Sequence, residues 1–129
     1  MRLMYKKLLI SIVFVSVLLI GCSGGSYTVH IGELSSSSNS ISGEYDRFSG
    51  YYFKEVKFAK GDTVQLTYSV STEQGSLSAR LLNSSGKVIK DITSDTTVQI
   101  TKNDTYKVRV DGQKHQGNFN ISWSRAKND

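Results

Sequence analysis

Hydrophobic and polar residues alternate with a period of two along most of the chain after Gly50. This pattern predicts half-buried β-strands, because successive side chains of a strand point to opposite faces. We expect the apolar members of each segment to face a shared core. These inward positions are Tyr52, Val56 and Phe58; Val64, Leu66, Tyr68 and Val70; Leu77, Ala79 and Leu81; Val98 and Ile100; Tyr106, Val108 and Val110; Phe119, Ile121 and Trp123.

Turn signals separate these segments. Examples are Glu73-Gln74-Gly75 and Asn83-Ser84-Ser85-Gly86, and the polar stretch 111–117 is expected to be a loop. No segment after residue 21 shows the i, i+3, i+4 apolar pattern of a helix. The sequence therefore predicts an all-β domain over residues 43–125, an antiparallel, jelly-roll-like β-sandwich of seven to eight short strands, followed by a polar tail over 126–129.

The start of the chain has a different pattern. Three basic residues precede an apolar run over 8–20 that only two serines interrupt. As a helix this run is about 20 Å long, whereas the hydrocarbon core of a bilayer is about 30 Å thick. A basic start, a short apolar run and a small residue at its end predict a helical signal peptide over residues 1–21.

Cys22 is the only cysteine, and it directly follows Leu19-Ile20-Gly21. This stretch resembles the lipobox of bacterial lipoproteins. The resemblance implies cleavage before Cys22 and a diacylglyceryl group on its sulfur, which would anchor the protein to a membrane outside the cytoplasm. That membrane is the outer leaflet of the plasma membrane in a Gram-positive cell and the outer membrane in a Gram-negative cell. The alternative is an ordinary export signal with an incidental cysteine.

Residues 22–42 are rich in serine and glycine, so we expect a flexible tether there. Residues 27–31 alternate and offer one short strand within it. If that strand pairs into the fold, the domain sits close to the membrane surface.

Charge excludes one class of partner. The formal charge of the chain is +5, and it falls to +2 when Arg2, Lys6 and Lys7 leave with the signal peptide. The remaining lysines are dispersed among acidic residues and form no basic stripe, so we expect no nucleic-acid partner.

A second resemblance covers about seventy residues. The stretches "FKEVKFAKGDTVQLTYSV", "LSARLLNSSGKVIKD", "DTYKVRVDG" and "GNFNISW" resemble, in this order, the bacterial pre-peptidase C-terminal domain. The chain departs from that family at Asn103-Asp104, where a glycine usually precedes the Thr-Tyr pair, and no peptidase is attached. The resemblance implies a non-catalytic sandwich with a role in binding or secretion.

Residues for catalysis are scarce. His30 and His115 are the only histidines, and Asp111 with His115 is the best available pairing. We expect both to be exposed loop residues, and Ser23 to lie in the tether, so we predict no enzyme, no cofactor and no metal site. A small hydrolase is the alternative, which would need His115 in a pocket beside a carboxylate.

The stretch "EYDRFSGYYF" holds five aromatic residues within ten positions. Alternation buries only one face of a strand, so Tyr45, Phe48 and Tyr51 are candidate ligand contacts. The alternative is that these rings fill the core at one end of the sandwich. We therefore expect a non-catalytic interaction module whose partner is an envelope protein or a glycan. The alternatives are a glycan- or peptidoglycan-binding module and a peptidase inhibitor of the small bacterial sandwich type, whose proline-containing loop is missing here.

Overall fold

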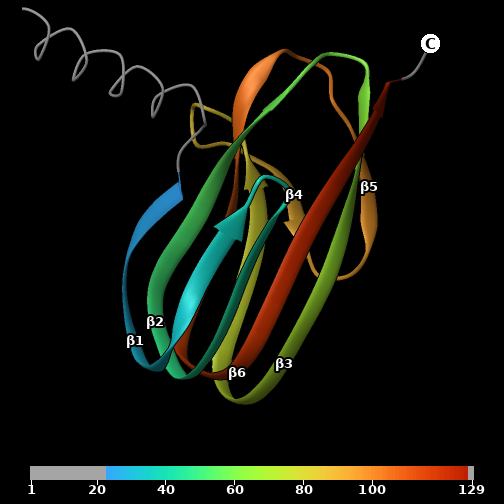
Figure 1. Cartoon of the computed structure of the whole chain (residues 1–129). Helices are drawn as coiled ribbons and strands as arrows, with labels where there is room; N and C mark the ends of the chain where they lie inside the picture. The colour runs from blue at the N-terminus through green and yellow to red at the C-terminus, as the bar shows by residue number, and fades with distance from the viewer. Residues whose placement is uncertain (1–22, 128–129) are drawn as a thin grey trace, which may run out of the picture.

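The computed structural model describes residues 23–127, which form one antiparallel sheet of six strands (Figure 1). The strands follow the order β1-β2-β6-β3-β4, and β5 pairs with β3. The expected all-β, antiparallel class is therefore confirmed. The strands are β1 (Ser23–Ser37), β2 (Ser40–Phe58), β3 (Asp62–Leu82), β4 (Val88–Ile92), β5 (Thr96–Gln99) and β6 (Asp104–Lys127).

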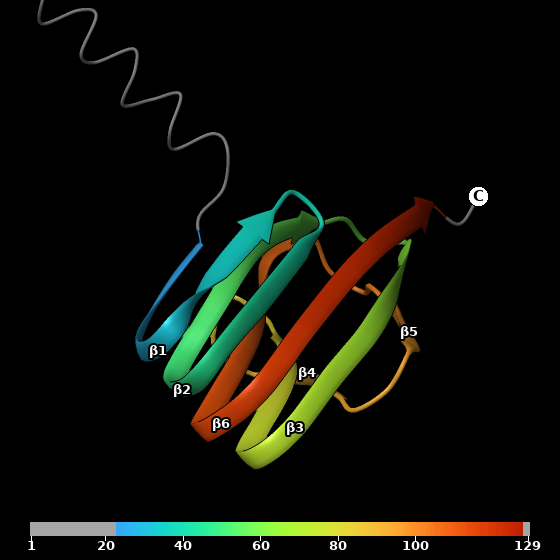
Figure 2. The ribbon, with the colours of Figure 1, turned by 60° about the horizontal axis from the view of Figure 1, so that its bottom comes forward.

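The sheet folds over on itself into a two-layered sandwich because its long strands bend near their middles (Figure 2). Strand β6 shows this most directly: each half of it pairs with a different half of β2 and β3. Strand β1 is the edge of both layers. The first layer contains residues 40–45 of β2, 117–127 of β6, 62–72 of β3, and β5; the second contains 48–58 of β2, 104–113 of β6, 76–82 of β3, and β4.

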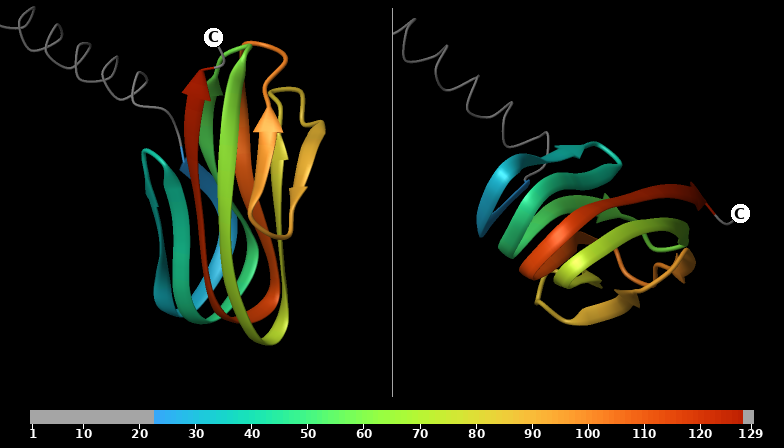
Figure 3. Two further views of the ribbon diagram at one scale, coloured as in Figure 1. Left: turned by 90° about the vertical axis from the view of Figure 1, so that its right-hand side faces the viewer. Right: turned by 90° about the horizontal axis from the view of Figure 1, so that it is seen from below.

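The bends lie together at one end of the molecule (Figure 3). We call this line of bends the crease and define it by Ile31, Asp46–Arg47, Glu73–Gly75 and Lys114. Register shifts occur there in β2 and β3, and Ile31, Gly75 and Lys114 have positive φ. Such irregularities bend a strand while its pairing continues on either side.

The opposite end carries the connections between strands. We call it the loop end and define it by residues 57–62, 83–87 and 100–104 together with Arg125 of β6. These segments are held to one another. The backbone N–H of Gly61 donates to the carbonyl of Ile100, that of Lys60 donates to Asn103, and the Arg125 guanidinium donates to the carbonyl of Lys57 at 2.7 Å.

The core lies between the two layers and contains most of the predicted inward positions. Val64, Leu66, Leu81, Val108 and Ile121 are fully buried, as the alternation predicts. Val56, Tyr68, Val70 and Leu77 are only partly buried and pack against the margin of this core. The count of seven to eight short strands differs from the six observed, because the expected breaks at 73–75 and 111–117 are bends inside β3 and β6.

The expected tether is instead the edge strand β1. Ser23–Ser37 pairs with β2 along its length, from Ser23 opposite Lys54 to Ser37 opposite Ser40. Glycine suits this strand at two positions, because a Cβ at Gly25 would collide with the carbonyl oxygen of Tyr51 and one at Gly32 with that of Glu44. Residues 23–37 therefore belong to the fold, which was expected to start near residue 43, and Ala126 and Lys127 of the expected polar tail belong to β6.

The predicted signal peptide and Cys22 lie outside the described residues. Within 23–127, no helix is long and apolar enough to cross a membrane.

Candidate functional site

The three aromatic residues predicted to contact a ligand do not form one surface. Tyr45 is 7% exposed and Phe48 is fully buried, and both rings pack with Phe119 in the core. Only Tyr51 is partly exposed, on the outer face of the second layer. The bend between Tyr45 and Phe48 explains this separation, because it shifts the alternation of β2 so that both rings turn inward.

Tyr51 begins an aromatic and cationic ladder on that outer face, which we define by Tyr51, Phe53, Lys107, Arg109 and Asp111 together with Arg80. The rings of Tyr51 and Phe53 are neighbours along β2 and nearly parallel, with an interplanar angle of 14° and centroids 6.4 Å apart. The Arg109 guanidinium lies 4.1 Å from the centroid of Tyr51, and the Lys107 ammonium lies 4.6 Å from that of Phe53. Cations from β6 therefore already cover faces of both rings.

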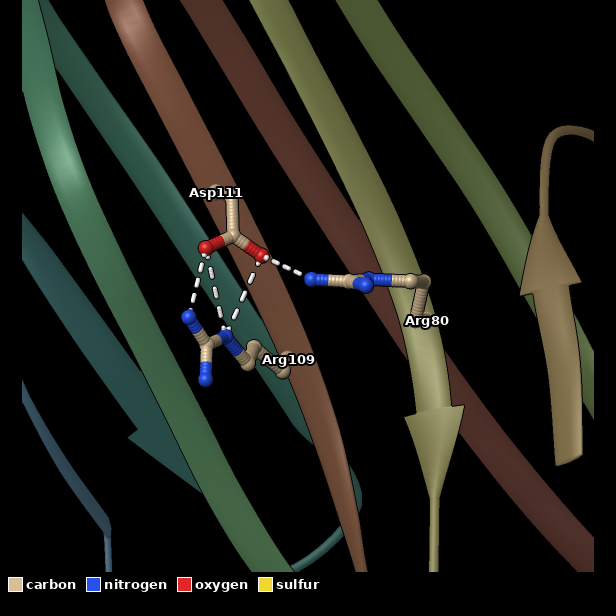
Figure 4. Close-up of polar contacts among 3 residues, drawn as sticks. All are labelled: Arg80, Arg109 and Asp111. Atoms are coloured by element: carbon tan, nitrogen blue, oxygen red, sulfur yellow. Dashed lines mark hydrogen bonds and ion pairs between the residues drawn. The ribbon is translucent and has the colours of Figure 1, made fainter. Parts of the chain in front are cut away.

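Asp111 connects the ladder to strand β3 (Figure 4). Its carboxylate accepts hydrogen bonds from Nη2 of Arg109 at 2.8 Å and from Nη2 of Arg80 at 3.0 Å. Burial by itself raises the pKa of Asp111, but the hydrogen bonds and charges of Arg109 and Arg80 outweigh burial and hold this pKa below its usual value. The carboxylate therefore stays ionised and ties β6 to β3.

Asp111 and His115, the best available pairing for a catalytic or metal role, do not meet in the structure, and the expectation that they are exposed loop residues is wrong. Asp111 engages arginines on the outer face, whereas His115 is fully buried near the crease. The ion pair between Arg109 and Asp111 could have been predicted from the sequence, because residues two positions apart lie on the same face of a strand.

His115 was expected on an exposed loop, and it instead lies between two hydroxyl groups. Its Nδ1 is 2.7 Å from the Tyr45 hydroxyl, and its Nε2 is 2.8 Å from the Thr72 hydroxyl. A hydroxyl can donate or accept, so both ring nitrogens of a neutral histidine are satisfied. Burial lowers the pKa of His115 and raises that of Tyr45, which keeps both groups neutral.

An open groove of about 650 Å³ lies at the crease, lined in part by Gly32, Tyr45 and Gly117. Four exposed carboxylates surround it, from Glu33, Glu44, Asp46 and Glu73. Among residues 23–127, however, no group of three or more histidine, cysteine or acidic side chains is placed to hold a metal ion.

Within the ladder, Asp111 pairs with Arg80 and Arg109. The hydrogen-bond partners of His115 are hydroxyl groups rather than a carboxylate. His30, the other histidine, is exposed on β1 opposite Arg47. Ser23, expected in the tether, starts β1.

Comparisons with known proteins add little. No protein-family model matches the chain, and no curated protein matches it significantly. Among solved structures, the chain is similar to one described as "Crystal structure of accessory secretory protein 1,2 and 3 in Streptococcus pneumoniae", with a TM-score of 0.38 and 11% identity over 78% of this chain and 95% of that chain. A likeness of this size carries no argument about function.

Proposed function

We propose that this protein is a lipid-anchored, extracytoplasmic bacterial lipoprotein whose β-sandwich is a non-catalytic interaction module. The observation that carries the proposal is the pattern at the start of the sequence. Basic residues precede an apolar run over 8–20, and Leu19-Ile20-Gly21 leads directly into Cys22, the only cysteine. Ser23, the first residue that the structure describes, already pairs in the edge strand β1, so a lipid on Cys22 would hold the sandwich close to the membrane.

The polar contacts support a non-catalytic domain. A hydrolase of the kind considered above needs a histidine beside a carboxylate and open to substrate. His115 is buried and hydrogen-bonded to Tyr45 and Thr72, and Asp111 is paired with two arginines. Each group is therefore occupied in stabilising the sandwich.

An interaction role is supported by the edge strand β1. One edge of β1 pairs with β2, and the strand ends the sheet on its other side. Tyr27 and Ile31 on this strand are among the large hydrophobic residues that remain exposed, at 45% and 70%. An exposed strand edge with apolar side chains is suited to pairing with an extended segment of another protein.

The glycan alternative loses most of its basis. Two of its three proposed contacts, Tyr45 and Phe48, are in the core, and a face of the third, Tyr51, is covered by Arg109. Stacking on a sugar ring requires an open aromatic face.

The lipid anchor is tested by replacing Cys22, whose sulfur would carry the lipid. Cys22→Ala should abolish incorporation of labelled fatty acid and leave the precursor uncut, as seen from the intact mass of the protein purified from its bacterial host. Ser26→Ala, a small change four residues after the cysteine, serves as the control and should be labelled and cleaved like the wild type. Continued labelling of Cys22→Ala would refute the anchor.

A further inference from the structure

Charge is unevenly distributed between the two ends of the sandwich. Five exposed cations belong to the loop end, from Lys57, Lys60, Lys87, Lys102 and Arg125. The carboxylates of this end are Asp62, which is 2% exposed, and Asp104, which accepts hydrogen bonds from Ser84. Five cations against two carboxylates leave the loop end with a formal charge of +3.

The crease together with its groove has the opposite sign. Four exposed carboxylates lie there, two of them within the crease and two, Glu33 and Glu44, beside it at the groove. The exposed cations of this region are Arg47 and Lys114, so four carboxylates against two cations give the crease and groove a formal charge of −2. The sandwich is therefore electrically polarised along its strands.

The direction of β1 relates this polarity to the proposed anchor. Ser23 lies opposite Lys54, four positions before β2 ends at Phe58 in the loop end. From there β1 runs to the crease, where Gly32 lies opposite Tyr45 (Figure 1). The first described residue therefore lies in the half that carries the loop end, and it directly follows Cys22 in the sequence.

Apolar side chains accompany the cations at this end. Val88 and Ile89 directly follow the 83–87 connection and are 40% and 38% exposed. Cations beside exposed apolar groups suit the interface of an anionic membrane, where the cations meet headgroups and the apolar groups enter the acyl boundary.

We propose that the loop end docks on the anionic phospholipid headgroups of the leaflet that holds the Cys22 lipid. This inference rests on the proposed lipid anchor. The anchor brings the loop end to the surface, where its positive charge is attracted, and the negative crease is repelled from the same surface. The domain then stands with its crease and the groove facing away from the membrane.

The test uses the lipidated protein reconstituted in vesicles. One set of vesicles is pure phosphatidylcholine, and the other contains roughly a third phosphatidylglycerol. Thr101→Cys places a thiol in the loop end, and Gln74→Cys places one at the crease; both positions are exposed. The measurement is the rate at which each thiol reacts with a water-soluble maleimide, since the sulfur of Cys22 is blocked when it carries the lipid.

The expected result is protection at one end only. In the anionic vesicles the Thr101→Cys thiol should react at least about fivefold more slowly than in pure phosphatidylcholine, since a single cation at an anionic surface already shifts binding by roughly that factor. Salt at about 0.5 M should remove the protection, because it screens charge over a few ångströms. Gln74→Cys should react equally fast in both vesicles.

A charge variant provides the matched control. Lys60→Gln with Lys102→Gln should abolish most of the protection at residue 101, whereas Arg47→Gln with Lys114→Gln, which removes two cations from the crease, should retain it. Equal rates for Thr101→Cys in both vesicle types would overturn the docking proposal.

Co-flotation with the vesicles separates the two proposals. A protein that floats with both vesicle types but shows no protection is anchored and undocked, so only the docking proposal fails. A protein that does not float with pure phosphatidylcholine and whose Cys22 thiol reacts with the maleimide has no lipid, and both proposals fail.

Discussion

The two ends of the sandwich both pass the chain from one layer to the other, but by different means. At the crease the long strands continue through the bend, so their pairing is interrupted for only a few residues. At the loop end the strands stop, and the chain crosses in connections such as Ala59-Lys60-Gly61. The crease therefore combines backbone strain with a buried histidine inside continuous strands, whereas the loop end consists of turns, such as 59–62, held by hydrogen bonds to the buried Asp62.

This difference predicts how each end tolerates change. Within the crease, a Cβ at Gly75 would collide with the carbonyl oxygens of Lys114 and Gln113, and His115 must keep both of its hydroxyl partners. At the loop end, a Cβ at Gly86 would meet nothing within 4 Å. Substitutions should therefore affect stability mainly at the crease and affect surface interactions mainly at the loop end.

The largest effect should come from the core that both ends share. Leu66→Asp in the first layer, or Val108→Asp in the second, buries an unpaired charge and should unfold the whole domain, since the cost is comparable to a typical total stability of about 5–15 kcal/mol. Gln65→Asp, on the exposed face of the same strand, should fold normally. Circular dichroism with thermal melts measures this, and a folded Val108→Asp would show that the layers do not share one core.

The next largest effect contrasts two glycines with similar positive φ. Gly75→Ala should lower the free energy of unfolding by about 3 kcal/mol or more, because left-handed strain is combined with a collision against backbone. Gly86→Ala has only the strain, which costs about 1–2 kcal/mol. Urea titration measures both, and equal losses would remove the distinction between the ends.

A pH titration tests the buried histidine at the crease. Burial lowers the pKa of His115 below its ordinary value of 6.5, so the unfolded chain binds a proton before the folded chain does. Stability should therefore fall as the pH drops below about 6.5, by at most roughly 1.4 kcal/mol per pH unit. The free energy of unfolding measured between about pH 7.5 and 5 reports this slope.

Two variants test whether His115 causes the dependence of the free energy of unfolding on pH. His115→Gln removes the titrating group and should flatten the dependence on pH, whatever its effect on absolute stability. His30→Gln, at an exposed position on β1, keeps His115 and should preserve the wild-type slope. A slope that persists in His115→Gln would assign the titration to another group.

The smallest effect should come from the ladder on the outer face of the second layer. Asp111→Asn removes the charge that Arg80 and Arg109 share, and the three side chains are 27–35% exposed. Partly exposed pairs contribute little, so we expect a loss of about 1 kcal/mol that shrinks at high salt. Glu33→Gln, at an exposed position on β1 away from the ladder, is the control, and an equal loss there would show that the ladder has no specific role.

Much of the fold could be predicted from the alternation of hydrophobic and polar residues. Leu66, Leu81, Val108 and Ile121 face the core as predicted, because a period of two forces every second side chain of a paired strand to one side. The bends in the long strands could not be predicted in this way. Glu73-Gln74-Gly75 and the polar residues 111–117 carry the residue types of surface turns, and whether such a segment ends a strand or bends it depends on what pairs with its flanks.

The candidate site was predicted less well for the same reason. Tyr45, Phe48 and Tyr51 are close in sequence, yet the shift in register at the crease sends the first two into the core and the third outward. His115 and Asp111 are likewise four residues apart, and they lie in different environments on either side of a bend in β6.

By itself the sequence determined the all-β class, the inward positions and the features that favour lipidation at Cys22, because these depend on local periodicity and on short contiguous motifs. The tertiary structure decided that residues 23–37 form a strand, that His115 is buried between Tyr45 and Thr72, and that charge is divided between the two ends. These features arise from contacts between residues far apart in the chain, and local sequence does not fix where a long strand bends.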